Sequence, residues 1–242
     1  MNEAYELLGD PAKSPVLIVV DHASRHVPGD IELGIDRAML TQHIAWDIGA
    51  ADVARMLVAE YGHAALLGGV SRLVADLNRY PHEAAAIPRA SDGIDIPGNR
   101  LNEALREERL SRFFHPYHDR LSAILDEHSP KLILSLHSFA PYLQEKPGQL
   151  RPWDVGVMYN KDDRGARLAL DFLATQSVIV GDQCPYSGEE LNATMNRNAE
   201  ARGIAYTGVE LRQDLLSGKV GIKEYAALLN EMLAHIQNHL PV

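Results

Sequence analysis

Polar residues able to bind a metal or catalyse a reaction follow several apolar runs that have the length of a buried strand. His22 comes after Val16–Val20, and His137 comes directly after Leu132–Leu136. The other cases are Ala205–Val209 followed by Glu210, and Ala64–Leu67 followed further along by Asn78 and Arg79. Ligands of open parallel sheets bind beside the carboxyl ends of the strands, so we expect these side chains to meet at one edge.

This set of side chains is typical of a metal-dependent hydrolase that acts on a carboxylate-bearing substrate. Catalytic zinc takes imidazole and carboxylate ligands and keeps one position open for water. We therefore expect zinc on His22 and His137, with Asp47 as the third ligand. The metal lowers the pKa of the water, Glu210 can pass its proton to the leaving amine, and Arg79 can grip a substrate carboxylate. Iron, manganese or nickel suit the same ligands.

Each of these residues also has an ordinary structural interpretation. A single histidine after a strand is more often a hydrogen-bonded residue than a metal ligand. Asp47 is a good N-cap for the helix that we expect to start there. The alternative pairs are Arg79 with Asp76 or Glu83, and Glu210 with Arg212. The metal-site interpretation depends on the occurrence of all these residues at successive strand ends.

Three further residues are weaker candidates. His118 follows His115 by three residues on one helical face. No third ligand is near in the sequence, so we expect His118 to contact substrate or to support the site. Ser187 lies in an expected turn whose hydroxyls and backbone N–H groups can hold a substrate. Cys184 has no adjacent cation to lower the pKa of its thiol, so we expect it to serve packing.

The elements that must position these residues alternate along the chain. Further apolar runs predict strands over 155–158 and 178–180, and helical spacing predicts helices over 47–61, 102–127, 163–174, 191–202 and 222–239. Such alternation is typical of an α/β fold with a mostly parallel sheet covered on both faces. The irregular residues 81–101, with three prolines and two glycines, predict a long functional loop, and 138–153 form a second irregular stretch.

Length, composition and charge exclude several classes of protein. The 242 residues suffice for one sizeable core, and we expect a single domain over 1–242. No apolar run reaches the roughly 18 residues that span a bilayer. The acidic N-terminus does not resemble a signal peptide, and the lone cysteine fits a reducing compartment, so we expect a cytoplasmic protein. The net charge of -10 argues against nucleic-acid binding but permits a small anionic substrate beside clustered arginines.

Six segments in consistent order carry a resemblance to a known family. They are Asp21–Pro28, His43–Ala50, Asp76–Arg79, His115–His118, Leu136–Phe139 and Val209–Asp214. Together they span roughly residues 16 to 216, and the chain resembles the N-formylglutamate amidohydrolase family, in a less characterised branch. The resemblance implies a three-layer α/β/α sandwich around a mixed sheet, similar to the zinc carboxypeptidase fold.

The resemblance also implies roles for particular residues. It places zinc on His22 and His137, assigns Glu210 as general base, and puts Asn78 and Arg79 on a substrate carboxylate. One position departs from the pattern. Zinc peptidases of this fold take a glutamate ligand three residues after the first histidine, where this chain has Arg25. We therefore expect the carboxylate ligand from Asp47, which leaves Arg25 available for the substrate or the transition state.

The activity implied is hydrolysis of the amide bond of an N-formyl or N-acyl amino acid, such as N-formylglutamate. Metal-activated water attacks the carbonyl, and the metal with Arg25 stabilises the oxyanion. Ser138 and Arg212 lie in the matching segments and are further candidates for substrate contact. The alternative is a metal-free binding or sensing domain that keeps the carboxylate clamp. The acyl group, the amino acid, the metal and the oligomeric state are left open by the sequence.

Overall fold

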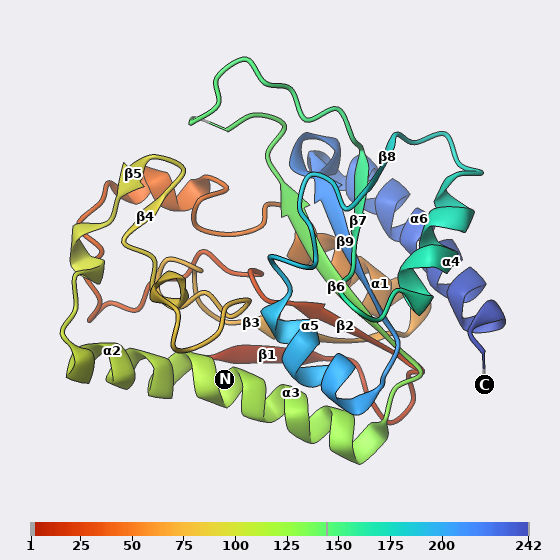
Figure 1. Cartoon of the computed structure of the whole chain (residues 1–242), viewed down its shortest axis with the longest axis horizontal. Helices are drawn as coiled ribbons and strands as arrows, with labels where there is room; N and C mark the ends of the chain where they lie inside the picture. Colours follow the sequence, from red (N-terminus) through yellow and green to blue (C-terminus); the bar gives the residue numbers. More distant parts are fainter. Residues whose placement is uncertain (1–2, 144, 242) are drawn as a thin grey trace.

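Within the part of the chain that the structure describes, a mixed sheet of seven strands forms the centre of the molecule (Figure 1). The structure is a computed structural model that describes residues 3–143 and 145–241. In spatial order the strands are β1 (Tyr5–Leu8), β3 (Ala64–Gly68), β2 (Val16–Val20), β6 (Leu132–Phe139), β9 (Tyr206–Arg212), β7 (Val155–Met158) and β8 (Val180–Asp182). Strands β3, β2, β6 and β9 run parallel, whereas β1 and β7 are antiparallel to their inner neighbours. The fold is therefore α/β with a mostly parallel mixed sheet.

Helices cover both faces of this sheet, which gives three layers (Figure 1). The helices on one face are α1 (Ala50–Tyr61), α4 (Arg164–Leu173) and α6 (Gly218–His239). The other face carries α3 (His115–His128) and α5 (Ala193–Asn198). Helix α2 (Glu103–Arg109) continues into α3 through a π-helical turn at Leu110–Phe114. None of the described helices is long and apolar enough to cross a membrane.

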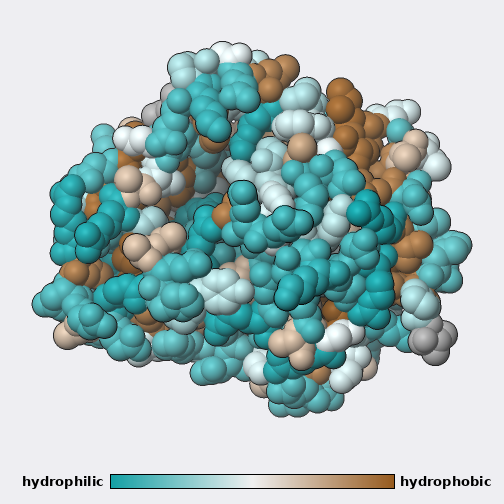
Figure 2. All heavy atoms as spheres, in the orientation of Figure 1, coloured by the Kyte–Doolittle hydropathy of each residue, from teal (hydrophilic) through white to brown (hydrophobic). Residues whose placement is uncertain are grey.

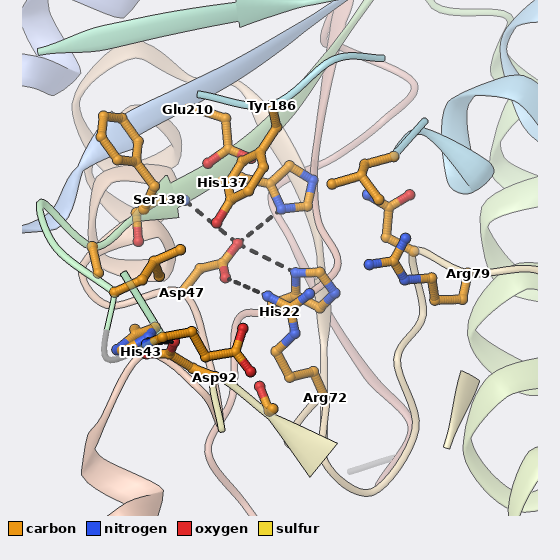
Figure 3. Close-up of a pocket in the computed structure, with 17 residues that line it drawn as sticks. His22, His43, Asp47, Arg72, Arg79, Asp92, His137, Ser138, Tyr186 and Glu210 are labelled. Atoms are coloured by element: carbon orange, nitrogen blue, oxygen red, sulfur yellow. Dashed lines mark hydrogen bonds and ion pairs between the residues drawn. The ribbon is translucent and has the colours of Figure 1, made fainter. Parts of the chain in front are cut away.

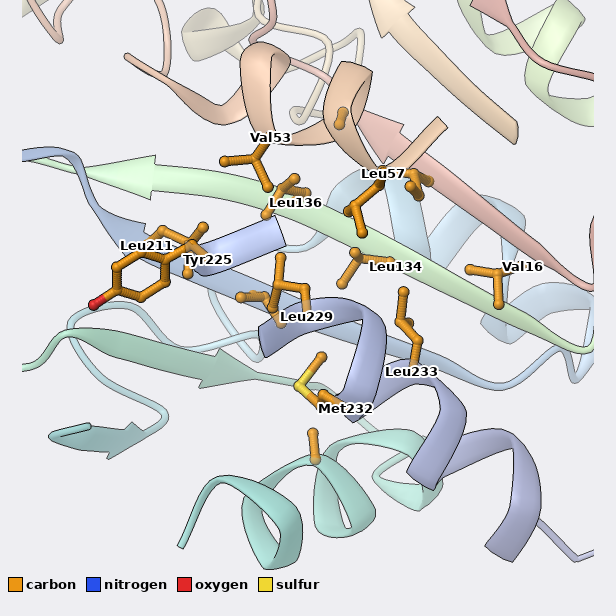
Figure 4. Packing of buried hydrophobic residues seen from close by; sticks show 14 of the residues in the cluster. Val16, Val53, Leu57, Leu134, Leu136, Leu211, Tyr225, Leu229, Met232 and Leu233 are labelled. Atoms are coloured by element: carbon orange, nitrogen blue, oxygen red, sulfur yellow. The ribbon is translucent and has the colours of Figure 1, made fainter. Parts of the chain in front are cut away.

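Alternation along β6 decides which side chains reach which face. Leu134 and Leu136 are fully buried on the face of the sheet that carries α1 and α6, where Leu134 lies near Leu229 and Leu233 and Leu136 lies near Val53 (Figure 4). Burying one such side chain contributes about 1.5–3 kcal/mol. Because successive residues of a strand point to opposite faces, His137 points toward the layer of α3 and α5. The same alternation in β9 directs Glu210 to that face, and the two residues are paired in register.

The structure corrects several expected boundaries. Strands β6 and β9 extend beyond the apolar runs, so His137 and Glu210 lie within strands rather than after them. Helix α1 begins at Ala50 instead of residue 47. Residues 81–101 contain a short hairpin, β4 (Ala90–Ser91) with β5 (Ile94–Asp95), which the sequence did not predict. Strand β1 was also not expected, and the expected strand over 178–180 lies at Val180–Asp182.

The surface seen from the same direction is mostly hydrophilic, and it is hollowed beside the β4–β5 hairpin (Figure 2). The carboxyl ends of β2, β6 and β9 carry His22, His137 and Glu210, which line a cavity of about 390 Å³. The parallel arrangement of these strands thus places the polar residues of three distant segments beside one another.

Candidate metal centre and active site

Three buried side chains converge on one point at the base of the cavity (Figure 3). Nδ1 of His22 lies 3.3 Å from Oδ2 of Asp47, and Nδ1 of His137 lies 2.8 Å from the same oxygen. Each of the three residues is at most 3% exposed, and one donor atom from each fits within 4.8 Å of the others. Two imidazole nitrogens and a carboxylate are a donor set that zinc accepts. The group is a candidate metal centre.

The chain around Asp47 directs its carboxylate toward the histidines. Its backbone N–H donates to the carbonyl of His22 at 2.9 Å, and the N–H of Ser138 donates to its Oδ2 at 3.4 Å. The hydroxyl of Ser138 donates to the carbonyl of Ile48 at 2.8 Å. The N-cap of α1 is Gly49, so the alternative interpretation of Asp47 as a helix cap is wrong.

The carboxylate of Asp76 contacts His22 on the nitrogen that faces away from Asp47, and Arg72 links the two carboxylates. Nε2 of His22 lies 2.7 Å from Oδ1 of Asp76. The guanidinium of Arg72 bridges the two carboxylates, at 3.0 Å from Asp76 and 3.4 Å from Asp47. A partner on Nε2 fixes the tautomer of a ligand histidine, so Nδ1 of His22 is left as the metal-binding atom.

His137 has a comparable set of partners behind it. Its Nε2 lies 3.3 Å from the hydroxyl of Ser135 and 3.8 Å from Oδ2 of Asp21. The hydroxyl of Tyr117 donates to the other oxygen of Asp21 at 2.7 Å. Within the described residues, Oδ2 of Asp21 has no hydrogen-bond partner. The imidazole of His137 therefore also presents Nδ1 to the centre.

The charges of this cluster are strongly coupled. Burial and Arg72 oppose protonation of His22, but Asp76 and Asp47 raise its pKa to about 9. Burial opposes ionisation of Asp47, yet His22 and His137 hold the pKa of that carboxyl well below its ordinary range. Without a metal, the carboxylate is neutralised by the imidazolium beside it. A metal ion that binds here displaces that proton.

Glu210 is a buried carboxyl group beside His137. It is 6% exposed, and its Oε2 lacks a hydrogen-bond partner among residues 3–143 and 145–241. Burial raises the pKa of Glu210 to about 7, with the Asp47 carboxylate adding to the increase and His137 opposing it. A carboxyl with that pKa can accept and return a proton near neutral pH.

Other cavity walls carry groups that can orient a substrate. Arg79 lines the cavity, and its Nε is 3.9 Å from Oδ2 of Asp76, too far for a firm ion pair. Asn78 is held by the N–H of Thr194, which donates to its Oδ1 at 3.0 Å. The ring of Tyr186 also reaches into the cavity near Glu210 (Figure 3).

Four predicted site residues lie outside the cavity. Arg25 is exposed, because the chain turns outward after His22, and its guanidinium lies over the ring of Trp46 at 5.7 Å. Arg212 is the last residue of β9, two positions after Glu210, and it pairs with Asp154 and Asp214 rather than with Glu210. The assignment of Arg25 and Arg212 to the site is therefore corrected.

The two remaining residues outside the cavity are His118 and Ser187. Nε2 of His118 donates to the carbonyl of Leu77 at 2.9 Å, so it supports the backbone just before Asn78, and it does not line the cavity. The hydroxyl of Ser187 accepts a hydrogen bond from the N–H of Glu189, and the neighbouring Tyr186 lines the cavity instead.

Sequence reasoning missed Arg72, Asp76 and Tyr186 as parts of the site. Arg72 and Asp76 are four residues apart and precede Asn78 and Arg79. The feature that could have identified them is the high proportion of charged residues in a stretch that is otherwise apolar. Tyr186 stands next to the predicted Ser187 and was considered only as part of a turn.

Comparisons with known proteins identify the family and the fold of the chain. The family model described as N-formylglutamate amidohydrolase matches residues 14–217. The gene product Atu2144 from Agrobacterium tumefaciens is 33% identical, with a TM-score of 0.92 and coverage of 97% of this chain and 95% of that one. N-formylglutamate amidohydrolase from Ralstonia eutropha JMP134 is 17% identical, with a TM-score of 0.71 and 98% of each chain covered, which shows likeness of fold. No curated protein matches the chain.

Proposed function

Because the chain belongs to the N-formylglutamate amidohydrolase family, we propose that it is a metal-dependent hydrolase that cleaves the amide bond of an N-formyl or N-acyl amino acid. The observation that carries this proposal is the convergence of His22, Asp47 and His137 beside the unpartnered carboxyl of Glu210. The carboxyl group of Glu210 would be costly to bury for structural reasons alone, because a buried polar atom without a partner destabilises a fold.

The metal we propose is zinc, held by Nδ1 of His22, Nδ1 of His137 and Oδ2 of Asp47. The chemistry of the donors supports this choice, because imidazole nitrogen and carboxylate oxygen bind zinc. When bound, such an ion supplies Lewis-acid activation of water and of the amide carbonyl. The carboxylate of Asp76, at 2.7 Å from Nε2 of His22, and the hydroxyl of Ser135, at 3.3 Å from Nε2 of His137, keep the two imidazoles in the ligating tautomer.

The chain's own residues then have distinct tasks. Arg79 and Asn78 hold the substrate carboxylate, since Arg79 is not firmly paired within the protein. Arg72 faces the cavity beside the ligand carboxylate and stabilises negative charge on the carbonyl oxygen, the task that the sequence had suggested for Arg25. Glu210 takes a proton from water and delivers it to the leaving nitrogen.

Replacement of Glu210 tests this assignment. Glu210→Gln preserves the size of the side chain and removes the proton acceptor, so we expect turnover to fall about 10²- to 10⁴-fold. Turnover is measured on a panel of N-acyl amino acids with the protein loaded with zinc, and bound zinc is quantified in parallel. Asp214→Asn, at an exposed position outside the cavity, is the matched control and keeps wild-type turnover.

Two results would contradict the proposal. Near-wild-type turnover by Glu210→Gln on an accepted substrate would remove Glu210 from the reaction. Failure of the wild-type protein to bind zinc in a calorimetric titration, together with binding of N-acyl amino acids, would instead indicate a metal-free binding domain.

A further inference from the structure

The cavity continues beyond the metal ligands on the side opposite Arg79. Figure 3 shows Arg79 on one side of the ligand group and His43, Asp92 and Ser138 on the other. Ser91 and Glu145 also line the cavity, and Glu145 contacts Asp92 through its backbone. We call this part of the cavity, walled by His43, Ser91, Asp92, Ser138 and Glu145, the acyl arm.

The walls of the acyl arm are fixed by hydrogen bonds between three segments. Asp92 forms the turn of the β4–β5 hairpin with φ of 44°, and its side chain is 6% exposed. Its Oδ2 lies 3.1 Å from Nε2 of His43, and its Oδ1 accepts a hydrogen bond of 3.1 Å from the N–H of Glu145. These hydrogen bonds hold the walls of the acyl arm in place.

The proposed function determines which part of a substrate enters this arm. With the substrate carboxylate on Arg79 and the amide carbonyl at the ligand group, the amino-acid portion occupies the space between them. The acyl group on the other side of the carbonyl then points into the acyl arm. A formyl group has only a hydrogen there, which contacts none of the polar walls.

We propose that the acyl group of the substrate is longer than formyl and ends in a hydrogen-bond donor, as in an aminoacyl amino acid; this rests on the proposed function. The arm contains the carboxylates of Asp92 and Glu145, and the latter has no partner in the described part of the chain. The imidazole of His43 is already engaged by Asp92. These walls suit an amine and repel an anionic acyl group.

The reaction consumes one water molecule. Its oxygen bonds to the acyl carbon, the carbon–nitrogen bond breaks, and Glu210 returns the proton to the nitrogen. The products are the free acid of the acyl group and the free amino acid, so an aminoacyl substrate yields two amino acids.

A graded acyl series tests the proposal directly. The probes are the N-formyl, N-acetyl, N-glycyl and N-succinyl derivatives of L-glutamate and of L-glutamine, each incubated with the zinc-loaded protein. We expect kcat/KM for N-glycyl to exceed that for N-formyl at least about tenfold, the range set by one or two added groups in a pocket. N-succinyl is expected to be the poorest substrate.

The outcomes separate this inference from the proposed function. If N-formyl or N-succinyl derivatives are cleaved as well as N-glycyl ones, the inference is overturned and the hydrolase proposal stands. If no derivative is cleaved, the hydrolase proposal itself fails.

Filling the arm provides a second test. Ser91→Phe narrows the arm, so we expect the ratio of kcat/KM for N-glycyl over N-formyl to fall about tenfold. Ala90→Phe, the preceding and exposed position of the same strand, is the matched control and leaves this ratio unchanged. An unchanged ratio in Ser91→Phe would overturn the inference.

Removing a wall charge tests the donor preference. Glu145→Gln is expected to lower the preference for N-glycyl over N-acetyl about threefold, as for an exposed ion pair. Asp95→Asn, on the same hairpin but paired with Arg100 outside the cavity, leaves the preference unchanged. Equal preferences in wild type and Glu145→Gln would show that the carboxylate does not meet the acyl group.

Discussion

At the scale of single residues, the site depends on which nitrogen of each imidazole is free. His22 is held at Nε2 by Asp76, and His137 faces Ser135 and Asp21 at the same atom. Both histidines therefore present Nδ1 to Asp47. A second partner behind each ligand is as much a part of a metal site as the ligand itself.

Asp21→Asn tests the support behind His137. The oxygen of the new amide stays with the hydroxyl of Tyr117, and the substitution removes the negative charge that lies 3.8 Å from Nε2 and favours a proton on that nitrogen. Without that charge, the tautomer of His137 that carries its proton on Nδ1, and so cannot bind a metal through that atom, becomes more populated. We expect zinc affinity, measured by chelator competition, to fall about 10- to 100-fold. Wild-type affinity in Asp21→Asn would contradict the role of this carboxylate.

His118 gives a prediction about pH and stability. Burial and the charge of Arg197 lower the pKa of His118 to about 3 in the folded chain, against about 6.5 in an unfolded one. Between these values only the unfolded chain binds the proton, so this histidine makes the free energy of unfolding fall as pH falls. That contribution is fully present above pH about 6.5 and is progressively lost toward pH 3.

His118→Gln keeps a donor for the carbonyl of Leu77 but cannot take up the proton. We expect the slope of unfolding free energy against pH, measured by urea denaturation between about pH 4 and 6, to become shallower by up to about 1.4 kcal/mol per pH unit. Identical slopes for the two proteins would show that His118 is protonated in the folded state.

At the scale of elements, the site is assembled by the pairing of the strands and by the position at which helix α1 begins. Register between β6 and β9 sets His137 beside Glu210. Helix α1 starts from Gly49, whose φ of 85° lets the chain turn after Asp47. A Cβ atom at Gly49 would lie 2.6 Å from Cβ of Leu216, so the helix start also packs closely against the segment after β9.

Gly49→Ala and Gly62→Ala form a matched pair at the two ends of α1. Both glycines have positive φ, but a Cβ at Gly62 meets nothing within 4 Å. We expect Gly62→Ala to cost about 1–2 kcal/mol of unfolding free energy from backbone conformation alone. Gly49→Ala should cost about 1–3 kcal/mol more, because Leu216 must move. If urea denaturation shows the same loss of unfolding free energy for both variants, the contact with Leu216 does not restrict the side chain at position 49.

At the scale of the whole molecule, the apolar layers bury a charged centre at the base of the cavity. The sheet is packed on both faces, and Asp47, Asp76 and His22 are each less than 5% exposed. Buried charges are tolerated only when they are paired or bind a metal. Metal binding is therefore linked to the stability of the entire fold.

Zinc is expected to stabilise the folded chain. At a free zinc concentration about 100 times Kd, the free energy of unfolding should rise by about 2.7 kcal/mol. Asp47→Asn, which removes the shared ligand, should abolish most of this increase. The measurement is urea denaturation with and without zinc. An equal increase in wild type and Asp47→Asn would place the zinc elsewhere.

The sequence alone determined the buried strands, the α/β class and the family, because apolar runs, turn residues and motif order are local features. It also pointed to His22, His137 and Glu210, since parallel strands present their ends at one edge, and to Asp47 as the carboxylate ligand in place of the glutamate absent at position 25. Only the tertiary structure decided the direction of each side chain. The outward path of the loop after β2 removed Arg25 from the cavity, and Arg72 took its place between Asp47 and Asp76. Directions of this kind depend on contacts between segments far apart in the chain, which local sequence patterns do not specify.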